Sequence, residues 1–385
     1  MRFTVCLALC LSFSQAGASS PWRLSEFCPA GFTLAQGVCR LNTLYQDYGS
    51  LQQAGVGGLR TGLPEARQGF TPQQIDLGRL LFFDPLLSAD GSLSCASCHQ
   101  PEHAFTDGRA LSVGVGGHVG KRSSPSLWNV GFLRTLFWDA RAESLEQQML
   151  GPLYADDEMA NTPEQLLELL NGVQAYKELF AQAFGSDDIQ LAQIYLALAA
   201  FESSLISLNS RYDLYAHGFQ DVLNENEIAG MNVFRSFVAR CAECHTPPLF
   251  TNQQIAVLGT PEPKGMPRDI GAEGPTGERS LRAGFKVPSL RNVALTAPYM
   301  HSGRFKSLRE AVAFYTGGRG HAVPEGEDLS IHWHIWEPKL TDTELDRLVD
   351  FLGTLTDQSF MPVIPEAVPS GLPLGKEAAK HSTIE

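Results

Sequence analysis

The spacing of apolar residues along the chain predicts a mostly α-helical protein. Over several stretches apolar residues recur every three or four positions, so one face of a helix would be apolar. Thr71 before Pro72 predicts the start of the first helix, and Thr341 with Glu344 forms a capping box for the last. Strand-like alternation is rare and short. We expect helices over the following ranges: 75–83, 144–150, 163–184, 188–208, 224–237, 307–315 and 341–355.

The first apolar run has a different character. Residues 3–13 are almost continuously apolar, they follow Arg2, and they precede the small residues Ala16 and Ala18. This order is typical of a cleaved secretory signal peptide, predicted here as 1–18. The run is too short to span a membrane, and no later stretch is long and apolar enough. We therefore expect export to the periplasm or cell surface, without a transmembrane segment.

The rest of the chain divides into two halves of similar plan. Each half has a helix, a cysteine motif, a loop and a further helix, which suggests an old duplication. The Gly-rich loop 113–120 cannot pack a core alone, so we expect it to wrap a cofactor or contact a second copy. The Pro- and Gly-rich span 246–289 is expected to be mostly loop. The predicted units are an N-terminal extension (19–60), an N-terminal domain (61–215), a C-terminal domain (216–365) and a tail (366–385).

Two copies of Cys-x-x-Cys-His are the strongest chemical signal in the chain. They are Cys95-Ala-Ser-Cys98-His99 and Cys241-Ala-Glu-Cys244-His245. This is the attachment signature of a c-type haem, in which both thiols form thioethers and the histidine binds the iron. A zinc site would need cysteine pairs that converge, and a redox-active dithiol needs no following histidine. The motifs therefore predict two covalent haems, with zinc binding and thiol redox chemistry as the alternatives.

The remaining cysteines and the charge narrow the picture further. Cys6 and Cys10 lie in the predicted signal peptide, which leaves Cys28 and Cys39. Because an exported protein permits disulfides, we expect this pair to staple the N-terminal extension, with a free reactive thiol pair as the alternative. The formal net charge is −13, which haem propionates make more negative, and this argues against a nucleic acid partner.

The order of short motifs around the two signatures resembles the bacterial dihaem cytochrome c peroxidase and MauG superfamily. The similarity covers roughly residues 70–356. It implies a mostly α fold with two c-type cytochrome domains, each carrying one covalent haem, and long loops. The motifs that carry it are Phe105-Thr-Asp-Gly108, Arg122-Ser-Ser-Pro125, Phe137-Trp-Asp-Ala-Arg-Ala142, Glu146-Gln-Gln-Met-Leu-Gly-Pro152, Asp157-Glu-Met159, Val287-Pro-Ser-Leu-Arg-Asn292 and Thr296-Ala-Pro-Tyr-Met-His301.

The resemblance also implies a division of labour between the haems. The first, on His99, is the high-spin site that reacts with hydrogen peroxide, and the second is its electron partner. Gln148, Pro152 and Glu158 match distal-pocket positions, and Glu158 is expected to transfer a proton during O–O cleavage. Trp138 matches an indole that lies between the haems and carries holes from one to the other. Without the resemblance, Glu158 would be a surface acid and Trp138 an ordinary buried indole.

The axial ligand of the second haem separates branches of the superfamily. Its peroxidases place a Met opposite the proximal His, whereas the resemblance places Tyr315 opposite His245. Met300 and Met266 are rival ligands that do not align. A phenolate favours high-valent iron, and a Tyr ligand is that of the MauG branch. His118 lies three residues from the position of the histidine that blocks the first iron in reductively activated relatives, so we expect an open first site.

A calcium ion between the haems is the third cofactor that the resemblance implies. The backbone carbonyls of Thr296 and Pro298 match its ligands, and oxygen donors suit this hard cation. One departure weakens the match, because the Asn side-chain ligand of the family is Ser123 here.

The N-terminal cysteine pair and the residues after it most resemble the MbnH-type branch. The implied function is a peroxide-dependent enzyme that forms a paired high-valent iron state. It would oxidise a residue, Trp to kynurenine, on an exported partner that is a copper-binding protein in that branch. The cluster Ile331-His-Trp-His-Ile-Trp336, with His332, Trp333, His334 and Trp336, is then an exit for holes, a docking surface or a copper-binding pair. A packed loop under the second haem is the plainer interpretation.

Two other functions remain open from the sequence. A dihaem cytochrome c peroxidase would reduce hydrogen peroxide with electrons from a small redox protein, and Tyr315 argues against it. A dihaem electron carrier would hold two six-coordinate haems that ignore peroxide, and the expected open first site argues against that.

Overall fold

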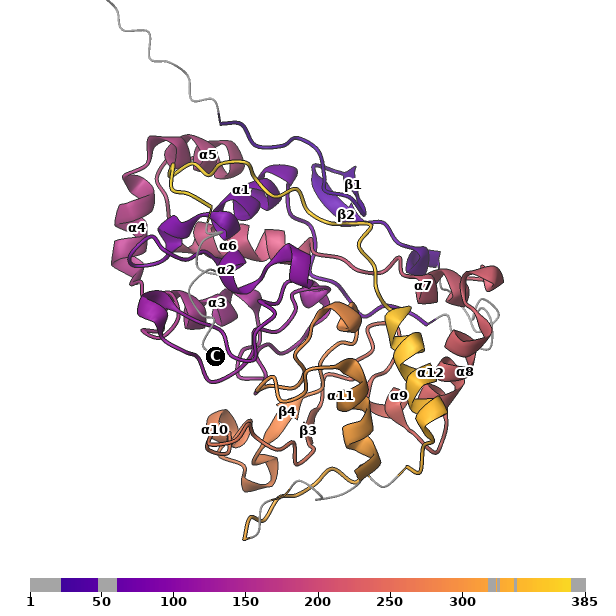
Figure 1. Cartoon of the computed structure of the whole chain (residues 1–385). Coiled ribbons are helices and arrows are strands. Elements are labelled where there is room, and N and C mark those ends of the chain that lie inside the picture. Colours follow the sequence, from indigo (N-terminus) through magenta and orange to yellow (C-terminus); the bar gives the residue numbers. More distant parts are fainter. Residues whose placement is uncertain (1–21, 48–60, 318–322, 324–325, 336–337, 375–385) are drawn as a thin grey trace, which may run out of the picture.

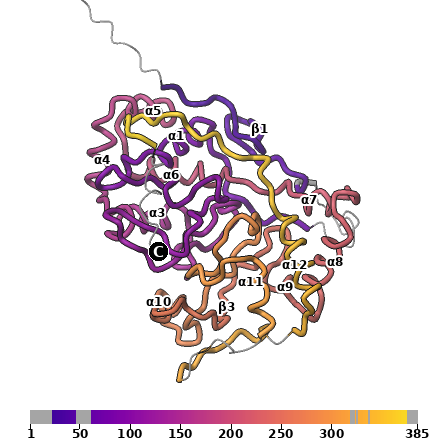
Figure 2. Tube along the Cα trace, viewed as in Figure 1, coloured from indigo at the N-terminus to yellow at the C-terminus, as the bar shows by residue number. Residues whose placement is uncertain are grey.

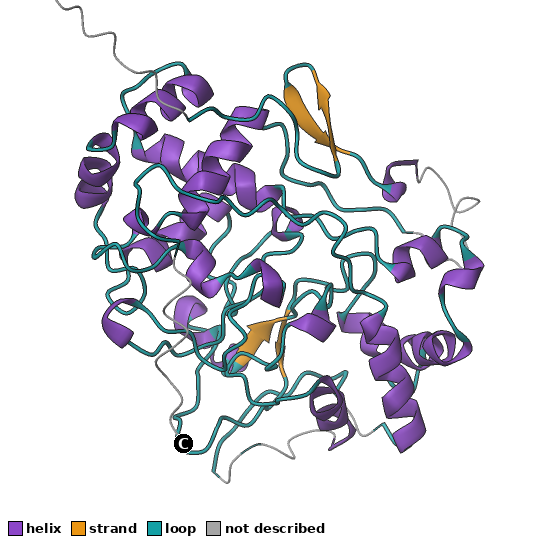
Figure 3. Ribbon diagram, turned by 45° about the horizontal axis from the view of Figure 1, so that its top comes forward, coloured by secondary structure: helices purple, strands orange, loops and turns teal. Residues whose placement is uncertain are grey.

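A computed structural model describes residues 22–47, 61–317, 323, 326–335 and 338–374. The predicted signal peptide, Trp336 and residues 375–385 lie outside the described residues. The fold is mostly helical, as predicted, with long loops between the helices (Figures 1 and 3). The helices are α1 (Pro72–Phe83), α2 (Cys95–Cys98), α3 (Leu145–Tyr154), α4 (Pro163–Asn171), α5 (Gln174–Phe184), α6 (Leu191–Ser203), α7 (Arg211–Ala216), α8 (Glu225–Arg235), α9 (Cys241–Cys244), α10 (Glu273–Thr276), α11 (Leu308–Phe314) and α12 (Asp342–Gly353).

The strands are few and short, again as predicted. β1 (Phe32–Ala35) pairs antiparallel with β2 (Val38–Leu41), and β3 (Ile255–Val257) pairs antiparallel with β4 (Gly284–Lys286). The second pair places two short strands in the span 246–289 that was expected to be mostly loop. Within the described residues, no helix combines the length and the apolar character needed to cross a bilayer.

Two predicted helices are shorter than the apolar pattern suggested. The helix expected over 163–184 is broken at Gly172 and Val173, where Gly172 ends α4 and the extended backbone of Val173 begins α5. The helix expected over 188–208 covers only Leu191–Ser203. Beyond it the chain is extended, because the backbone of Leu205 accepts from Asn129 (2.8 Å) and that of Ser207 donates to the Asn129 side chain (2.9 Å).

Each half of the molecule is built on a pair of crossing helices. α1 crosses α6 at Gly78, where a Cβ atom would lie 1.8 Å from the carbonyl oxygen of Ala197. α8 crosses α12 at Gly230, where a Cβ atom would lie 1.8 Å from the carbonyl oxygen of Arg347. Only glycine permits so close an approach of two backbones. The two helix pairs lie in different parts of the fold, and each pair contributes residues to a separate apolar core (Figures 1 and 2).

An internal repeat extends from these helix pairs into the loops. The segments Pro125–Val130 and Pro288–Val293 differ only in Trp128 against Arg291. Within them Asn129 (φ 61°) and Asn292 (φ 58°) share a left-handed backbone. The same register relates the whole of 125–152 to 288–315 without a gap, as the following matched pairs show: the bridges Leu136–Ala142 and Tyr299–Phe305, and the N-caps Ser144 of α3 and Ser307 of α11. These pairs support the duplication that the sequence suggested.

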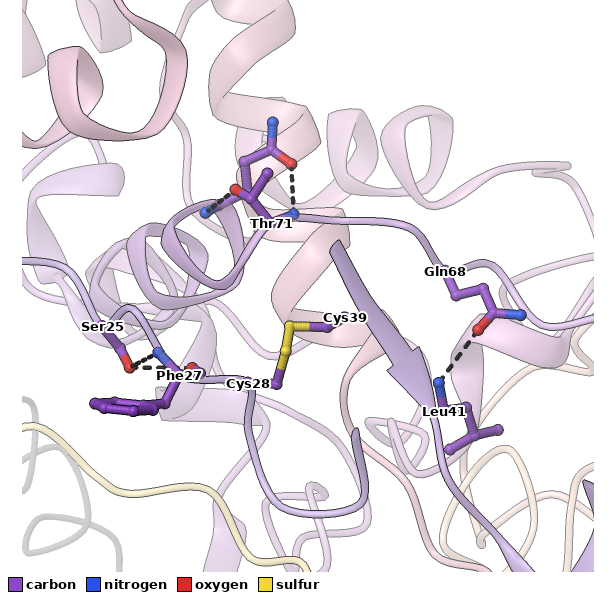
Figure 4. Close-up of a disulfide and its surroundings, with 8 residues drawn as sticks. Ser25, Phe27, Cys28, Cys39, Leu41, Gln68 and Thr71 are labelled. Carbon is purple, nitrogen blue, oxygen red and sulfur yellow. Dashed lines mark hydrogen bonds between the residues drawn. A yellow bond between two sulfur atoms is a disulfide. The ribbon is translucent and has the colours of Figure 1, made fainter. Parts of the chain in front are cut away.

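The two ends of the described chain both pack on the first half. The β1–β2 hairpin carries the predicted disulfide between Cys28 and Cys39, which the structure confirms (Figure 4). Cys39 is buried, and its backbone N–H donates to the carbonyl of Phe70 just before α1 (2.8 Å). After α12 the chain, yellow in Figure 1, returns across the first half, where Val368 joins the core and Ser370 donates to Asp84 (2.7 Å). The predicted tail is thus in part a structural strap.

Candidate functional site

The four motif cysteines lie on two single helical turns, α2 and α9. All four are free thiols, with no disulfide within either motif. Burial raises the pKa of Cys98 and of Cys241 to about 12, and it raises the pKa of Cys95 and Cys244 as well. A redox-active dithiol has a lowered pKa instead. The sites therefore suit thiols that are consumed in covalent attachment better than thiols that exchange with a substrate.

Both motif histidines are oriented by backbone carbonyls. His99 Nδ1 lies 2.9 Å from the carbonyl oxygen of Phe105, and His245 Nδ1 lies 3.1 Å from that of Phe250. A hydrogen bond at Nδ1 leaves Nε2 for a metal ion, which is the usual arrangement for a ligating histidine. Burial lowers the pKa of His99 and lowers that of His245 to about 4, so both rings are neutral and able to ligate.

The cysteine pairs do not converge on a shared zinc site. Each pair belongs to a different half of the repeat and packs on a different core. Among the residues that the structure describes, no group of three or more His, Cys, Asp or Glu side chains could hold a metal ion. The described residues therefore give the zinc alternative no support.

A cavity of about 290 Å³ opens beside the second cysteine turn. Its wall contains Cys241, Cys244 and His245 from α9 and the loop after it, and Tyr315 from the end of α11. The burial of Tyr315 raises the pKa of its phenol. Two thiols, an imidazole and a phenol around one cavity are the donor types that would hold a covalent haem with a His and a Tyr ligand. The residues present thus fit the predicted group.

The repeat locates the equivalent face in the first half. In α11 and its C-cap, the residues that line the cavity are Leu308, Ala311, Val312 and Tyr315. In the register of the repeat they correspond to Leu145, Gln148, Met149 and Pro152 of α3. Gln148 and Pro152 therefore lie on the α3 face that corresponds to the cavity-lining face of α11. Pro152 occupies the position of Tyr315, and its side chain has no atom that could bind iron.

Glu158 follows α3 and is held by the Gly-rich loop. Its backbone carbonyl accepts from Val115 (2.8 Å), and a Cβ on Gly114 would lie 2.0 Å from the carbonyl oxygen of Asp157. The residue keeps contact with solvent, but desolvation by the surrounding protein raises the pKa of its carboxyl. Asp157 raises this pKa further, and Arg141 opposes the shift. The loop 113–120 thus packs against the candidate proton-transfer residue.

Trp138 joins the two halves. Its indole N–H donates to the carbonyl of Ser123 (2.9 Å), and its own carbonyl accepts from the backbone of Lys286 (2.7 Å). Although Trp138 belongs to the first half, it lines the cavity of the second. The repeat pairs it with His301, whose ring stacks on Phe285 at a centroid distance of 3.9 Å.

The residues considered for calcium lie along the same cavity. Thr296 and Pro298 line it, and the Ser123 hydroxyl donates to the carbonyl of Met300 (3.1 Å). Calcium binding stays a prediction. Of the rival iron ligands, Met300 also lines the cavity, whereas Met266 is not among its lining residues and His118 is exposed.

The aromatic cluster before residue 336 is partly buried and partly exposed. His334 lines the cavity, and its Nε2 lies 2.8 Å from a carboxylate oxygen of Glu243, inside the second cysteine turn. Trp333 is 65% exposed, and its ring lies 3.5 Å from that of His334, centroid to centroid. The packed-loop interpretation therefore fits His334 but not Trp333.

Two charged residues near the cysteine turns were not indicated by any sequence motif. Lys286 lines the cavity, and burial lowers its pKa to about 8. Glu202 is buried in α6 near Cys95. Neither residue belongs to a motif with a known chemistry. The repeated Pro-Ser-Leu-x-Asn-Val segment is the sequence signal that could have aligned the two halves and shown which positions are equivalent.

Comparisons with known proteins agree with this geometry. The family described as "Di-haem cytochrome c peroxidase" matches residues 72–221. The cytochrome c551 peroxidase of Nitrosomonas europaea is 34% identical over 77% of this chain and 85% of its own length. The methylamine utilization protein MauG of Methylorubrum extorquens is 34% identical over 77% of this chain and 82% of its own length.

Solved structures give the same family. A MauG-like protein associated with microbial copper homeostasis is 34% identical, with a TM-score of 0.70 over 77% of this chain and 94% of that one. The dihaem peroxidase BthA from Burkholderia thailandensis is 27% identical, with a TM-score of 0.65 over 80% of this chain and 98% of that one. This chain therefore belongs to the dihaem cytochrome c peroxidase and MauG family of oxidoreductases.

Proposed function

We propose that this protein uses hydrogen peroxide to oxidise a residue, Trp to kynurenine, on an exported partner protein. The observation that carries the proposal is the pairing of His245 and Tyr315 in the wall of one cavity, with Pro152 in the equivalent place of the first half. His245 and Tyr315 would both hold the second haem, whereas His99 alone would hold the first, because Pro152 has no ligating atom. Bound in this way, the first haem would supply a site for peroxide, and the second would supply oxidising equivalents to a large substrate that cannot enter a pocket.

The chain's own residues divide the work at the first site. When bound, the first haem supplies an iron at which the O–O bond of hydrogen peroxide is cleaved with two electrons. His99, oriented through Nδ1, holds that iron from the proximal face. Glu158 takes the proton from the oxygen nearer the iron and delivers it to the farther oxygen, which leaves as water. The Gln148 amide lies on the same helix face as Pro152 and orients the peroxide.

Cys95 and Cys98 anchor the first haem, and Cys241 and Cys244 anchor the second. Trp138 carries electrons from the second site to the first, because it belongs to one half and lines the cavity of the other. Thr296 and Pro298 would hold a calcium ion beside it.

A copper-binding protein is the partner that we propose. The support is the 34% identity to a MauG-like protein associated with microbial copper homeostasis. The predicted signal peptide places the reaction in the periplasm or at the cell surface, where such a partner would also be exported.

One equivalent of hydrogen peroxide added to the fully oxidised protein tests the proposal. We expect both ferric EPR signals to disappear together, and Mössbauer spectra to show both irons changed. A Tyr315→Met variant should confine the change to the first site, because a thioether favours the ferrous state that a phenolate disfavours. A protein that reacts only after one haem has been reduced would contradict both the Tyr315 assignment and the open first site.

A dihaem cytochrome c peroxidase is the second candidate. The 34% identity to the cytochrome c551 peroxidase of Nitrosomonas europaea favours it. It predicts sustained peroxide reduction with a small cytochrome or a cupredoxin as electron donor. The partner-oxidising enzyme predicts slow turnover with these donors.

A further inference from the structure

Glu202 is a buried carboxyl that the proposed chemistry does not use. It lies in α6 with 6% of its surface exposed, and its Oε2 has no hydrogen-bond partner among the described residues. A buried carboxyl oxygen without a hydrogen-bond partner costs free energy of folding, so its presence needs a physical reason. A protein that needed only packing here would use an apolar residue.

The repeat places Glu202 against the first haem site. Gly78 approaches Ala197 and Phe201 of α6 as Gly230 approaches Arg347 and Phe351 of α12. In this register Glu202 corresponds to Leu352, which lines the cavity beside the second cysteine turn. The carboxyl therefore occupies, in the first half, the place of a leucine that faces the haem cavity in the second.

The charges around Glu202 agree with that placement. The pKa of the Cys95 thiol is raised by burial and then by the nearby Glu202 carboxyl, which locates Glu202 at the first attachment turn. Burial and Glu146 raise the pKa of Glu202 to about 8, and Arg67 opposes them. Arg67 and Glu146 form an ion pair with each other that is about one-third exposed.

Neither α1 nor the turn Val130–Phe132, which both pack on α6, brings a counterion to Glu202. On α1 the charged residues Asp76 and Arg79 pair with each other (2.7 Å). The turn Val130–Phe132, which packs on Ser203, has no charged residue. The cation that acts on Glu202 is thus Arg67, which is already paired with Glu146, and it does not hold the pKa of Glu202 at its ordinary value.

We propose that Glu202 is a redox-linked proton site of the first haem, holding a proton when the iron is ferrous and releasing it when the iron is ferric. A carboxylate at low dielectric favours the extra positive charge of the ferric state. Reduction then takes one electron from the reductant and one proton from solvent onto the Glu202 carboxylate, and oxidation returns both. The second site has Leu352 and lacks this coupling. The inference requires only a haem on Cys95 and Cys98, so it is independent of which substrate the enzyme oxidises.

Spectroelectrochemical titration of the intact dihaem protein tests the coupling. Between about pH 6 and about pH 10, a range that spans the raised pKa of Glu202, the ferric-to-ferrous ratio of the first haem at fixed potential should rise with pH. The steepest expected change is tenfold per pH unit, which corresponds to 59 mV. The Glu202 variants are the control rather than the second haem, because Lys286 lines the cavity of the second site and its pKa, lowered by burial to about 8, falls in the same range.

Three substitutions separate a proton site from a packing role. Glu202→Gln and Glu202→Leu should both abolish the slope of the first haem, and the leucine is the residue that the second half uses naturally. Glu202→Asp should keep it. Glu164→Gln, which removes an exposed carboxyl from α4, should change nothing. A slope that survives in Glu202→Gln or Glu202→Leu would overturn the proposal.

A measurement on the unmodified protein tests the proposal even if the variants fail to bind haem. Redox-difference infrared spectra should contain the C=O band of a protonated carboxylic acid that appears on reduction and shifts in D₂O. The absence of this band would also overturn the proposal.

Discussion

The acidity of Glu158 is set by what surrounds it. The Gly-rich loop fixes its backbone through Val115, and desolvation together with Asp157 raises the pKa of its carboxyl, against the opposing charge of Arg141. In the sequence it is one of three consecutive acids, and nothing in the run distinguishes it. The structure distinguishes it, because the Gly-rich loop holds its backbone and desolvation raises the pKa of its carboxyl.

Substituting Glu158 should change both the rate and the pH profile of peroxide reduction. Only the carboxylate can accept a proton, so the rate should fall as the pH drops through its raised pKa, above about pH 4.3 where an ordinary glutamate titrates. Glu158→Gln should remove this limb and slow the reaction by about 10²- to 10⁴-fold. Stopped-flow mixing of the ferric protein with peroxide across pH measures both effects.

The neighbours of Glu158 provide paired controls. Arg141→Leu should move the limb to higher pH because it removes the charge that lowers the pKa, and Asp157→Asn should move it to lower pH. Asp156→Asn, an exposed neighbour, should leave the profile unchanged. If the limb persists in Glu158→Gln, another group transfers the proton.

At the scale of elements, the sequence predicted the helices that depend on local signals. The predicted N-cap at Thr71 and the predicted capping box at Thr341 are both confirmed. The apolar run after Ser203 misled the prediction, because its backbone pairs with Asn129, some 75 residues earlier in the chain. Periodicity cannot reveal such a contact.

In the candidate sites too, the sequence revealed the local motifs and did not reveal the contacts between distant segments. The attachment turns were visible as motifs, and the structure orients their histidines as ligation requires. Glu202 was not visible, because its meaning arises only when α6 is superposed on α12 through the two glycine crossings. A buried carboxyl on an apolar helix has no sequence signature of its own.

Those crossings make a prediction about helix packing. Gly230→Ala would place a Cβ 1.8 Å from the Arg347 carbonyl and force α8 from α12, so we expect a loss of about 1–3 kcal/mol or more in the free energy of unfolding. Chemical denaturation followed by circular dichroism measures it. Gly353→Ala at the end of α12 is the matched control, because its Cβ meets nothing within 4 Å, and it should be neutral or slightly stabilising. Equal effects of the two would exclude the packing explanation.

At the scale of the whole molecule, one buried charge cluster ties distant segments together. The Arg291 guanidinium, fully buried, donates to both carboxylate oxygens of Asp213 (2.5 and 2.7 Å) and to the carbonyl of Pro248 (2.5 Å). The Tyr45 hydroxyl of the N-terminal extension donates to the same carboxylate (2.5 Å). The cluster thus joins the extension, α7 and the repeat segment of the second half.

Asp213→Asn should therefore destabilise the protein by about 3–5 kcal/mol, because it leaves a buried guanidinium without its counter-charge. Burial alone would raise the pKa of Asp213, but the charge of Arg291 and the hydrogen bonds from Arg291, Tyr45 and Ser210 together lower it by more, so the folded pKa lies below the ordinary value. The stabilisation is then fully present above the unfolded pKa and is lost as the pH falls through the folded one. Denaturation at neutral and acidic pH measures both statements. Arg309→Leu, which breaks an exposed pair with Asp342, should leave stability unchanged.

Trp333 offers a route from the second site to the molecular surface. Its exposed ring contacts that of His334, which lines the cavity and binds Glu243 of the attachment turn. An exposed indole that is linked to the redox site should be the first residue to lose electrons when no partner is present. One equivalent of peroxide should therefore oxidise Trp333 in the isolated protein, detected by peptide mass spectrometry, and spare Trp128, which is 4% exposed.

Replacing Trp333 distinguishes electron transfer through this residue from the reaction of the haems with peroxide. Trp333→Phe keeps the ring contact with His334 but cannot easily lose an electron, so oxidation of the haems by peroxide should be unaffected while the oxidised state lasts longer. Partner oxidation should slow, and more so when Trp336 is also Phe. Unchanged partner turnover in the double variant would mean that electrons enter by another path, and unchanged decay of the oxidised state would place Trp333 outside the path even without a partner.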